Sequence, residues 1–344
     1  MIKIPYSLSE LDTMATIFYK DLEKEFNIKN NLQNWPNDEL KLVMDYLAKN
    51  LKKIICGRPH ELESEIGSLK NLVDTAKQNY KSNNPKNSKG KDITNSDLHS
   101  WFKREIFKVF DYDISKDSFT KKDSGRLAYR HAKRLGMNTC PYCNANFTFT
   151  IRNKRLKSRP QFDHFYNKSR HPYLSLSFYN LIPSCVLCNS GALKGQKEFS
   201  LAKNSHPFIE SIDNIYQFRT KITAVDFLVS AGSFELKMVL CDKVKYKNPV
   251  AVKVRNNIEI FALNDRYRYH KDIAESVIRN SHIYCNTAIL DLYKTFQING
   301  KSIFNSELEI KELIVGNYLS KADSHKRIHT KMVRDIAEEF GLVI

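Results

Sequence analysis

The sequence lacks any long apolar run. No stretch of the 344 residues approaches the roughly eighteen consecutive apolar residues that a transmembrane helix needs. Residues 1–5 begin neither an apolar signal core nor a small-residue cleavage site. We therefore expect a cytoplasmic protein with no membrane partner. No internal repeat is visible, and the apolar fraction of 42% is ordinary for a protein with a packed core.

Disulfides are also unexpected, because cytoplasmic proteins keep their thiols reduced. The chain nevertheless contains seven cysteines, so cysteines that are paired by their spacing point to a metal. Three others, Cys56, Cys241 and Cys285, stand alone in largely apolar surroundings. We interpret these three as small residues of the core.

Acidic residues are scarce relative to basic ones. The chain has 38 Asp and Glu against 55 Lys and Arg, a net charge of +17. A polyanion such as DNA is the usual partner of such a chain, because neutralising phosphates releases their counterions. A lysine-rich, AT-biased genome would produce the same excess, so the charge alone leaves both interpretations open.

The N-terminal part predicts helices. Apolar residues recur at helical spacing through much of 1–80, which we expect to be a helical region. The polar residues 81–97 are rich in Lys, Asn and Ser and predict a linker or loop. Further helices are expected at 98–110 and around 125–135. The basic face of the 125–135 helix would lie on a phosphate backbone or face solvent.

The segment 98–210 is expected to hold the core of the protein, with two helices preceding it. Alternation predicts strands at 147–151 and 161–166, and a helix should begin near Val186. The remainder, 211–344, is expected to be mixed and then helical. Its expected elements are strand-like runs at 224–229, 234–241 and 251–261, forming a short sheet within 222–261, and helices at 272–296, 307–318 and 325–340.

Two Cys-x-x-Cys units form the strongest motif. Cys140 and Cys143 make the first, and Cys185 and Cys188 make the second. Two such units supply the four thiolates of a tetrahedral Zn²⁺ site. Four thiolates leave no open coordination position, so the zinc would be structural and would stabilise a segment too polar to fold alone. A zinc ribbon that only binds nucleic acid or a partner would show the same motif.

Between these units lies an Asp-His pair, Asp163 and His164. A carboxylate is a hard oxygen ligand suited to Mg²⁺, and a neutral imidazole can activate water near neutral pH. Adjacent strand residues face opposite sides, so the pair would flank a site unless the strand end bends. Asn180 begins a short apolar piece, and Asn189 directly follows the last cysteine, where a zinc would hold it rigidly.

The runs 162–165, 180–190 and 194–195 closely resemble the signature of the HNH, or ββα-metal, endonucleases. The four-cysteine form, with an Asn directly after the fourth Cys, is similar to a zinc-knotted phage Holliday-junction resolvase. It is also similar to the HNH component of Septu-type and retron anti-phage systems. The resemblance covers about sixty residues; the C-terminal helices resemble the same group only weakly.

The resemblance implies an α+β fold with a small ββα-metal core and structural zinc, embedded in mainly helical terminal regions. It implies that Asp163 and Asn189 hold one catalytic divalent metal, Mg²⁺ or Mn²⁺. His164 would be the general base, and Asn180 would orient the loop that carries it. The implied function is DNA cleavage in anti-phage defence, with a partner ATPase docked on the flanking regions.

Several other residues are candidates for contacts with phosphate or metal. Lys194 is displaced by three residues from its usual place behind the last Asn, so its phosphate contact is open. His171 and His206 each precede a proline and either bind metal or phosphate or simply lie in loops. Seven basic residues flank the Asp-His pair and would position a phosphate backbone or line a solvated hairpin turn: Arg152, Lys154, Arg155, Lys157, Arg159, Lys168 and Arg170.

Two alternatives remain open at the level of sequence. A ribonuclease would use the same residues, because the scissile phosphate looks alike in DNA and RNA. A non-catalytic, zinc-dependent nucleic-acid-binding protein would need the cysteines but not His164. A single HNH site cuts one strand per engagement, so cleavage of a duplex would need a homo-oligomer or two encounters.

Overall fold

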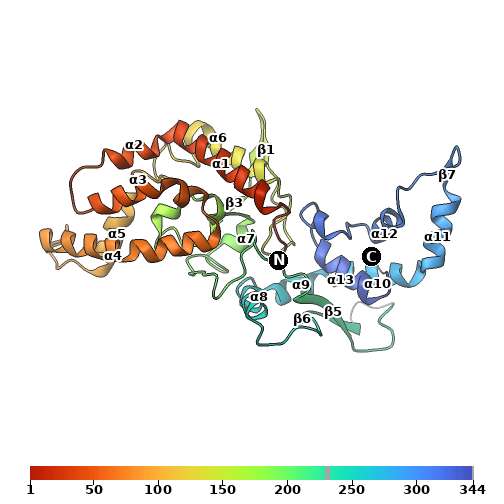
Figure 1. Cartoon of the computed structure of the whole chain (residues 1–344). Helices are drawn as coiled ribbons and strands as arrows, with labels where there is room; N and C mark the ends of the chain where they lie inside the picture. Colours follow the sequence, from red (N-terminus) through yellow and green to blue (C-terminus); the bar gives the residue numbers. More distant parts are fainter. Residues whose placement is uncertain (229–232, 343–344) are drawn as a thin grey trace.

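The computed structural model describes residues 1–228 and 233–342. N-terminal helices form one end of an elongated molecule, C-terminal helices form the other, and short strands lie between them (Figure 1). The fold is α+β, as the sequence predicts. Among the residues described, no helix is both long and apolar enough to cross a membrane.

Six helices build the N-terminal end. They are α1 (Leu8–Phe26), α2 (Ile28–Gln33), α3 (Lys41–Cys56), α4 (Pro59–Asn83), α5 (Asn95–Ile106) and α6 (Lys122–Leu135). Ser7 caps α1 through a reciprocal pair of bonds with Glu10, which satisfies backbone donors that the first turn leaves free. Helix α4 extends beyond residue 80, so the expected polar linker is shorter than its composition suggests.

The basic face of α6 is turned toward α1. Arg130 and Arg134 bond the two carboxylate oxygens of Asp21, at 2.7 and 2.6 Å. Arg126 pairs in the same way with Glu25. These two acids pair with the three arginines of α6 within the fold, so much of this face is engaged by α1 rather than free to bind phosphate, while Lys133 stays exposed.

The central segment carries two small antiparallel pairs. The strands are β1 (Ile151–Arg152) with β2 (Lys157–Ser158), and β3 (Gln161–His164) with β4 (Leu181–Ser184). A single helical turn, α7 (Val186–Asn189), follows β4. The strand expected at 147–151 is therefore wrong except at its last residue, and the helix expected from Val186 is only one turn long.

The C-terminal end combines two antiparallel strand pairs, β5–β6 and β7–β8, with helices. Its elements are β5 (Tyr216–Ile222), β6 (Phe234–Leu240), α8 (Pro249–Ile260), α9 (Leu263–Tyr267), α10 (Lys271–Ile283), α11 (Asn286–Thr295), β7 (Gln297–Ile298), β8 (Lys301–Ser302), α12 (Glu307–Val315) and α13 (Thr330–Glu339). The strand expected at 251–261 is wrong, because Asn248 caps a helix there and Pro249 occupies its first position.

Three other predicted C-terminal elements differ in part from the structure. The sheet expected within 222–261 is the β5–β6 hairpin, which begins earlier and ends at Leu240. Residues 224–228 form a bend and turns where a strand was expected, and Val229 lies outside the described residues. The long helix expected at 272–296 is broken into α10 and α11 at Tyr284 and Cys285.

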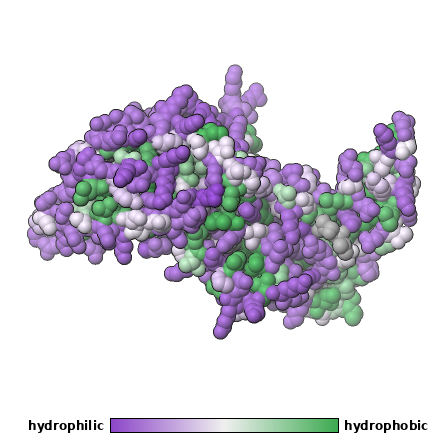
Figure 2. Space-filling model, in the orientation of Figure 1, coloured by the Kyte–Doolittle hydropathy of each residue, from purple (hydrophilic) through white to green (hydrophobic). Residues whose placement is uncertain are grey.

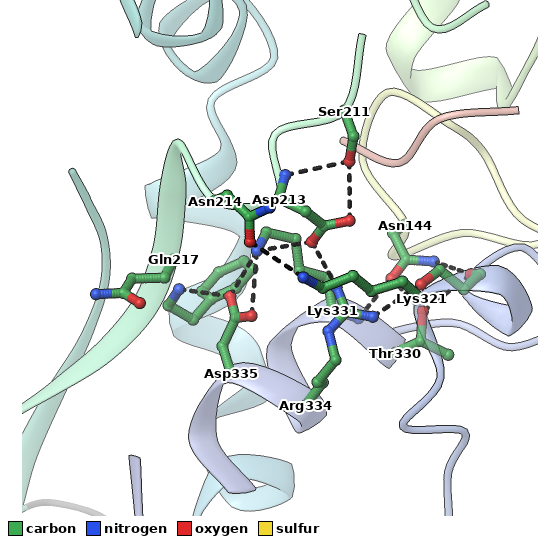
Figure 3. A network of polar contacts seen from close by, with 12 residues as sticks. Asn144, Ser211, Asp213, Asn214, Gln217, Lys321, Thr330, Lys331, Arg334 and Asp335 are labelled. Carbon is green, nitrogen blue, oxygen red and sulfur yellow. Dashed lines mark hydrogen bonds and ion pairs between the residues drawn. The ribbon is translucent and has the colours of Figure 1, made fainter. Parts of the chain in front are cut away.

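Buried charges attach α13 to the rest of the fold (Figure 3). Lys331 lies 2.8 Å from Asp335 and 3.2 Å from Asp213, and Arg334 pairs with Asp213 as well. Asp335 also accepts a hydrogen bond from the backbone of Phe218 on β5. Two cations and two carboxylates thus compensate one another, which a buried charge requires.

Candidate metal centre and adjacent cleft

The four predicted cysteines converge on one buried point. The sulfur atoms of Cys140, Cys143, Cys185 and Cys188 all lie within 4.8 Å of one another, with Cys143 and Cys185 4.0 Å apart. Thiolates around a tetrahedral zinc are separated by about 3.8 Å, given Zn–S bonds of about 2.3 Å. The cluster therefore has the donor set and spacing to hold a metal ion such as zinc, as its sequence spacing predicts.

The C-terminal elements close over this cluster. Arg266 of α9 places a guanidinium nitrogen 3.3 Å from the sulfur of Cys188, and Tyr267 donates a hydrogen bond to the carbonyl of Cys143. A cation beside the cluster offsets the net negative charge that four thiolates leave on one zinc. The cysteine centre is thus completed by residues far away in the sequence.

Asn144 makes the second attachment to the C-terminal end. Its side-chain amide donates to the carbonyls of Ser324 and Arg327, and its oxygen accepts from Thr330 and from the backbone of Lys331. These bonds hold the start of α13 against the first Cys-x-x-Cys unit, at the right of Figure 3.

The second Cys-x-x-Cys unit fixes the candidate catalytic residues. In the β3–β4 pair, Asp163 lies opposite Ile182 and His164 lies opposite Leu181. The chain then leaves β4 into Cys185, which caps α7 and accepts a hydrogen bond from the Cys188 backbone. The cysteine centre therefore holds the strand pair and α7 in one unit.

Asp163, His164 and Asn189 line one cleft of about 480 Å³. The two strand residues reach the same cleft, although alternation would place them on opposite sides, because β3 ends at His164. Arg159, Lys168 and Asp113 also line the cleft, and Lys168 pairs with Asp113. Asn180 is fully buried and does not line it.

Both oxygens of the Asp163 carboxylate have partners. Lys194 places its ammonium nitrogen 2.9 Å from Oδ1, and the Tyr142 hydroxyl donates to Oδ2 at 2.7 Å. Burial and the neighbouring carboxylate raise the pKa of Tyr142 well above its usual value, so the phenol keeps the proton that it donates. Asp163 is thereby held in one orientation.

His164 is held as a neutral imidazole of one tautomer. Its Nε2 lies 3.0 Å from the carbonyl oxygen of Ser175, which can only accept, so Nε2 carries the proton and Nδ1 carries the lone pair. Burial lowers the pKa of His164 to about 3, and the cations of Lys168 and Lys194 act in the same direction. Tyr112 packs edge-on against the ring, with the two centroids 4.6 Å apart.

Asn180 braces the chain that follows His164. Its Oδ1 accepts from the Tyr166 backbone at 2.7 Å, while its amide group donates to the carbonyls of Tyr166 and Leu174. These bonds close the loop between β3 and β4. The loop that these bonds close is the one that carries His164; the orienting role that the resemblance implies for Asn180 stays a prediction.

Asp163 and Asn189 have oxygen atoms to offer a hard cation. Each Asp163 oxygen accepts one hydrogen bond and has two lone pairs, so each keeps one free. The amide nitrogen of Asn189 donates to Gln161 at 2.8 Å, which leaves its oxygen free of that bond. A carboxylate and an amide oxygen suit Mg²⁺ or Mn²⁺, so the residues present fit such an ion.

The three residues whose roles the sequence left open lie elsewhere. Lys194 is buried at the back of the site, bonded to Asp163 and to the carbonyl of His164, rather than facing a phosphate. His206 is buried against Phe165 in the core. His171 lies outside the cleft lining, 3.9 Å from Glu198.

Sequence reasoning missed Tyr142, Asn144 and Arg266. The first two lie inside or beside the first Cys-x-x-Cys unit, but an interior tyrosine or a following asparagine has no specific signal. Arg266 had none at all. The core assignment of isolated cysteines is also wrong in part, because Cys285 is exposed and Cys56 and Cys241 are only half-buried.

No family model, curated protein or solved structure matches this chain. Its function must therefore be inferred from its own residues.

Proposed function

We propose that this protein is a metal-dependent endonuclease of the HNH type that cleaves phosphodiester bonds of DNA. The observation that carries the proposal is the meeting of Asp163, His164 and Asn189 in one cleft, on a strand pair and helical turn held by the cysteine centre. A carboxylate, an amide oxygen and an imidazole can supply metal ligands and a general base for phosphodiester hydrolysis, here on a rigid support.

His164 supplies the base in this proposal. With Nε2 bonded to a carbonyl, the lone pair of Nδ1 is the one that can take a proton from water. Water oxygen then bonds to phosphorus as the bond to the leaving oxygen breaks. A buried ring of low pKa is by itself a weak base, but an anionic phosphate beside it would favour the protonated form.

Asp163 and Asn189 would hold one Mg²⁺ or Mn²⁺. When bound, such an ion stabilises the charge that develops on the phosphate and on the leaving oxygen. Lys194 and Tyr142 keep the carboxylate oriented, and Asn180 keeps the His164 loop in place. Action in anti-phage defence with a partner ATPase is the biological setting that the resemblance suggests.

The test is cleavage of supercoiled plasmid with Mg²⁺ or Mn²⁺, comparing the wild type with His164→Ala. We expect metal-dependent nicking that His164→Ala abolishes while zinc content and thermal unfolding stay unchanged. His282→Ala, which changes an exposed histidine, is the matched control and should cut normally. Equal cutting by wild type and His164→Ala would refute the proposal.

Two other outcomes would replace the proposed function with a different one. Cleavage of RNA but not of DNA of the same sequence would make the protein a ribonuclease with the same site. Nucleic-acid binding that needs the cysteines, without cleavage of either substrate, would make it a zinc-dependent binding protein.

A further inference from the structure

Five basic residues follow the first Cys-x-x-Cys unit, and residues 147–161 contain no acid at all. The five basic residues are Arg152, Lys154, Arg155, Lys157 and Arg159. All lie in the β1–β2 hairpin or directly after strand β2. The hairpin stands out from the body of the molecule in Figure 1, and its projecting end is hydrophilic in Figure 2.

The charges of this hairpin differ from the other basic charges near the cleft. Lys168 pairs with Asp113 at 2.5 Å, and Arg170 pairs with Glu198. By contrast, no carboxylate in the described part of the chain pairs with Lys154, Arg155 or Lys157, and all three are exposed. Uncompensated cations on a projecting element attract a polyanion.

Strand pairing and the side chain of Asn153 hold the hairpin in one conformation. Ile151 pairs with Ser158, and the Asn153 oxygen accepts from the backbones of Arg155 and Leu156 at 2.9 and 2.7 Å. Such a side-chain cap fixes the turn. Ordered cations lose less conformational freedom on binding than those of a floppy loop.

The base of the hairpin is fixed to the body. Arg152 donates to the carbonyl of Asp123, and both Arg152 and Arg159 lie over the ring of Tyr129, at 5.6 and 5.8 Å from its centre. These contacts support the hairpin where it leaves the fold. Beyond its base, the hairpin carries its free charges into solvent.

The hairpin also leads directly into the cleft. Its second strand continues through Arg159, which lines the cleft, into β3 with Asp163. The chain from Arg155 to Asp163 spans at most about 26 Å at about 3.3 Å per residue. This is less than one turn of a duplex, about 34 Å, so one nucleic acid can contact both.

We infer that the β1–β2 hairpin is a substrate-binding finger whose Lys154, Arg155 and Lys157 contact the phosphate backbone within one helical turn of the cleft. The exposed side chain of Leu156 lies among these cations and would meet the sugar or base edges. This inference rests on the proposed function for the identity of the ligand, but it concerns binding rather than cutting.

The experiment measures binding separately from cleavage. In a His164→Ala background, we compare the hairpin with and without the changes Lys154→Gln, Arg155→Gln and Lys157→Gln. Fluorescence anisotropy follows labelled duplexes of about thirty base pairs, of DNA and of RNA, across a salt series. Loss of three phosphate contacts should lower the slope of log affinity against log salt by about 2.7. Affinity near physiological salt should fall at least about tenfold.

The matched control removes the same charge elsewhere, by Lys243→Gln, Lys245→Gln and Lys247→Gln in the exposed loop before α8. We expect it to keep most of the slope and affinity. An unchanged slope in the hairpin variant, or an equal loss in the control, overturns the inference. DNA-selective and RNA-selective losses both support it and identify the substrate. Hairpin-dependent binding by a wild type that does not cut would refute the proposed function alone.

Discussion

The ammonium of Lys194 lies 2.9 Å from Oδ1 of Asp163, and the two side chains are only 1% and 2% exposed. The same ammonium donates to the carbonyl of His164 and lies 4.7 Å from the ring centre of Phe199. Lys194 therefore fixes both the carboxylate and the end of β3. Its role is to position the candidate catalytic pair from behind.

Lys194→Met should lower the free energy of unfolding by about 3–5 kcal/mol, because it leaves a buried carboxylate without its cation. Urea denaturation measures this change. The additional substitution Asp163→Asn should recover much of the loss, since both charges are then gone. Lys203→Met, at an exposed lysine, is the control. A loss below about 1 kcal/mol in the first variant would mean that the ion pair is not formed.

The cysteine centre should bind one zinc ion per chain. Elemental analysis of the purified protein measures the content, and a chelator should lower the thermal unfolding midpoint because metal binding supplies folding free energy. Cys188→Ser should lose zinc and stability together. Cys285→Ser, at an exposed cysteine outside the cluster, should change neither. Full zinc content in Cys188→Ser would contradict a four-thiolate site.

The two site asparagines should respond differently to truncation. Asn180→Ala leaves one buried N–H and two buried carbonyls of the His164 loop without this partner. The free energy of unfolding should therefore fall by about 3 kcal/mol. Asn189→Ala removes one bond to exposed Gln161 and should change stability little, while nuclease activity falls. Urea unfolding and plasmid nicking separate the two effects. Equal destabilisation would argue against a ligand role for Asn189.

Two buried histidines should make stability fall in mild acid. Burial lowers the pKa of His206 to about 3 and that of His131 well below its usual value. The unfolded chain takes up protons below about pH 6.5, whereas these folded-state rings stay neutral. Each of these two histidines therefore lowers the free energy of unfolding by about 1.4 kcal/mol when the pH falls from neutral to 5.5.

Thermal unfolding at pH 7.5 and 5.5 measures this dependence. His131 lies among aromatic rings, and neither of its nitrogens has a hydrogen-bond partner among the described residues, so His131→Phe should reduce the pH dependence. His282→Phe, at an exposed histidine, should leave it as in the wild type. An unchanged slope in His131→Phe would show that this ring is protonated in the folded protein.

The sequence predicted the local parts of the site and missed the distant ones. Cys-x-x-Cys spacing specifies a metal knuckle by itself, and alternation predicted the strand that contains β3, whereas β4 was recognised only as a short apolar piece. The C-terminal partners of Asn144 lie beyond residue 320, and no spacing rule connects them to it. Lys194 could be noticed only as a departure, because its burial depends on how the chain turns after α7.

Helix and strand were confused where β-branched residues cluster. Residues 251–261 are rich in Val and Ile, which favour strands, but Asn248 and Pro249 supply a cap and a first helical turn. The local start signal outweighed composition. At 147–151, alternating Phe and Thr suggested a strand, yet Phe147 and Phe149 stack on each other and stay half exposed, and Phe147 forms only an isolated bridge with Thr139.

The attachment of Asn144 to α13 also sets an order of events in time. A ribosome makes the four cysteines long before it makes the backbone groups at 324–331 that Asn144 binds. A nascent chain can therefore bring its four thiolates together early, but the cysteine cluster acquires these contacts only after residues 324–331 have been made. Until these residues are made, the side-chain groups of Asn144 that bind them must make hydrogen bonds with water instead.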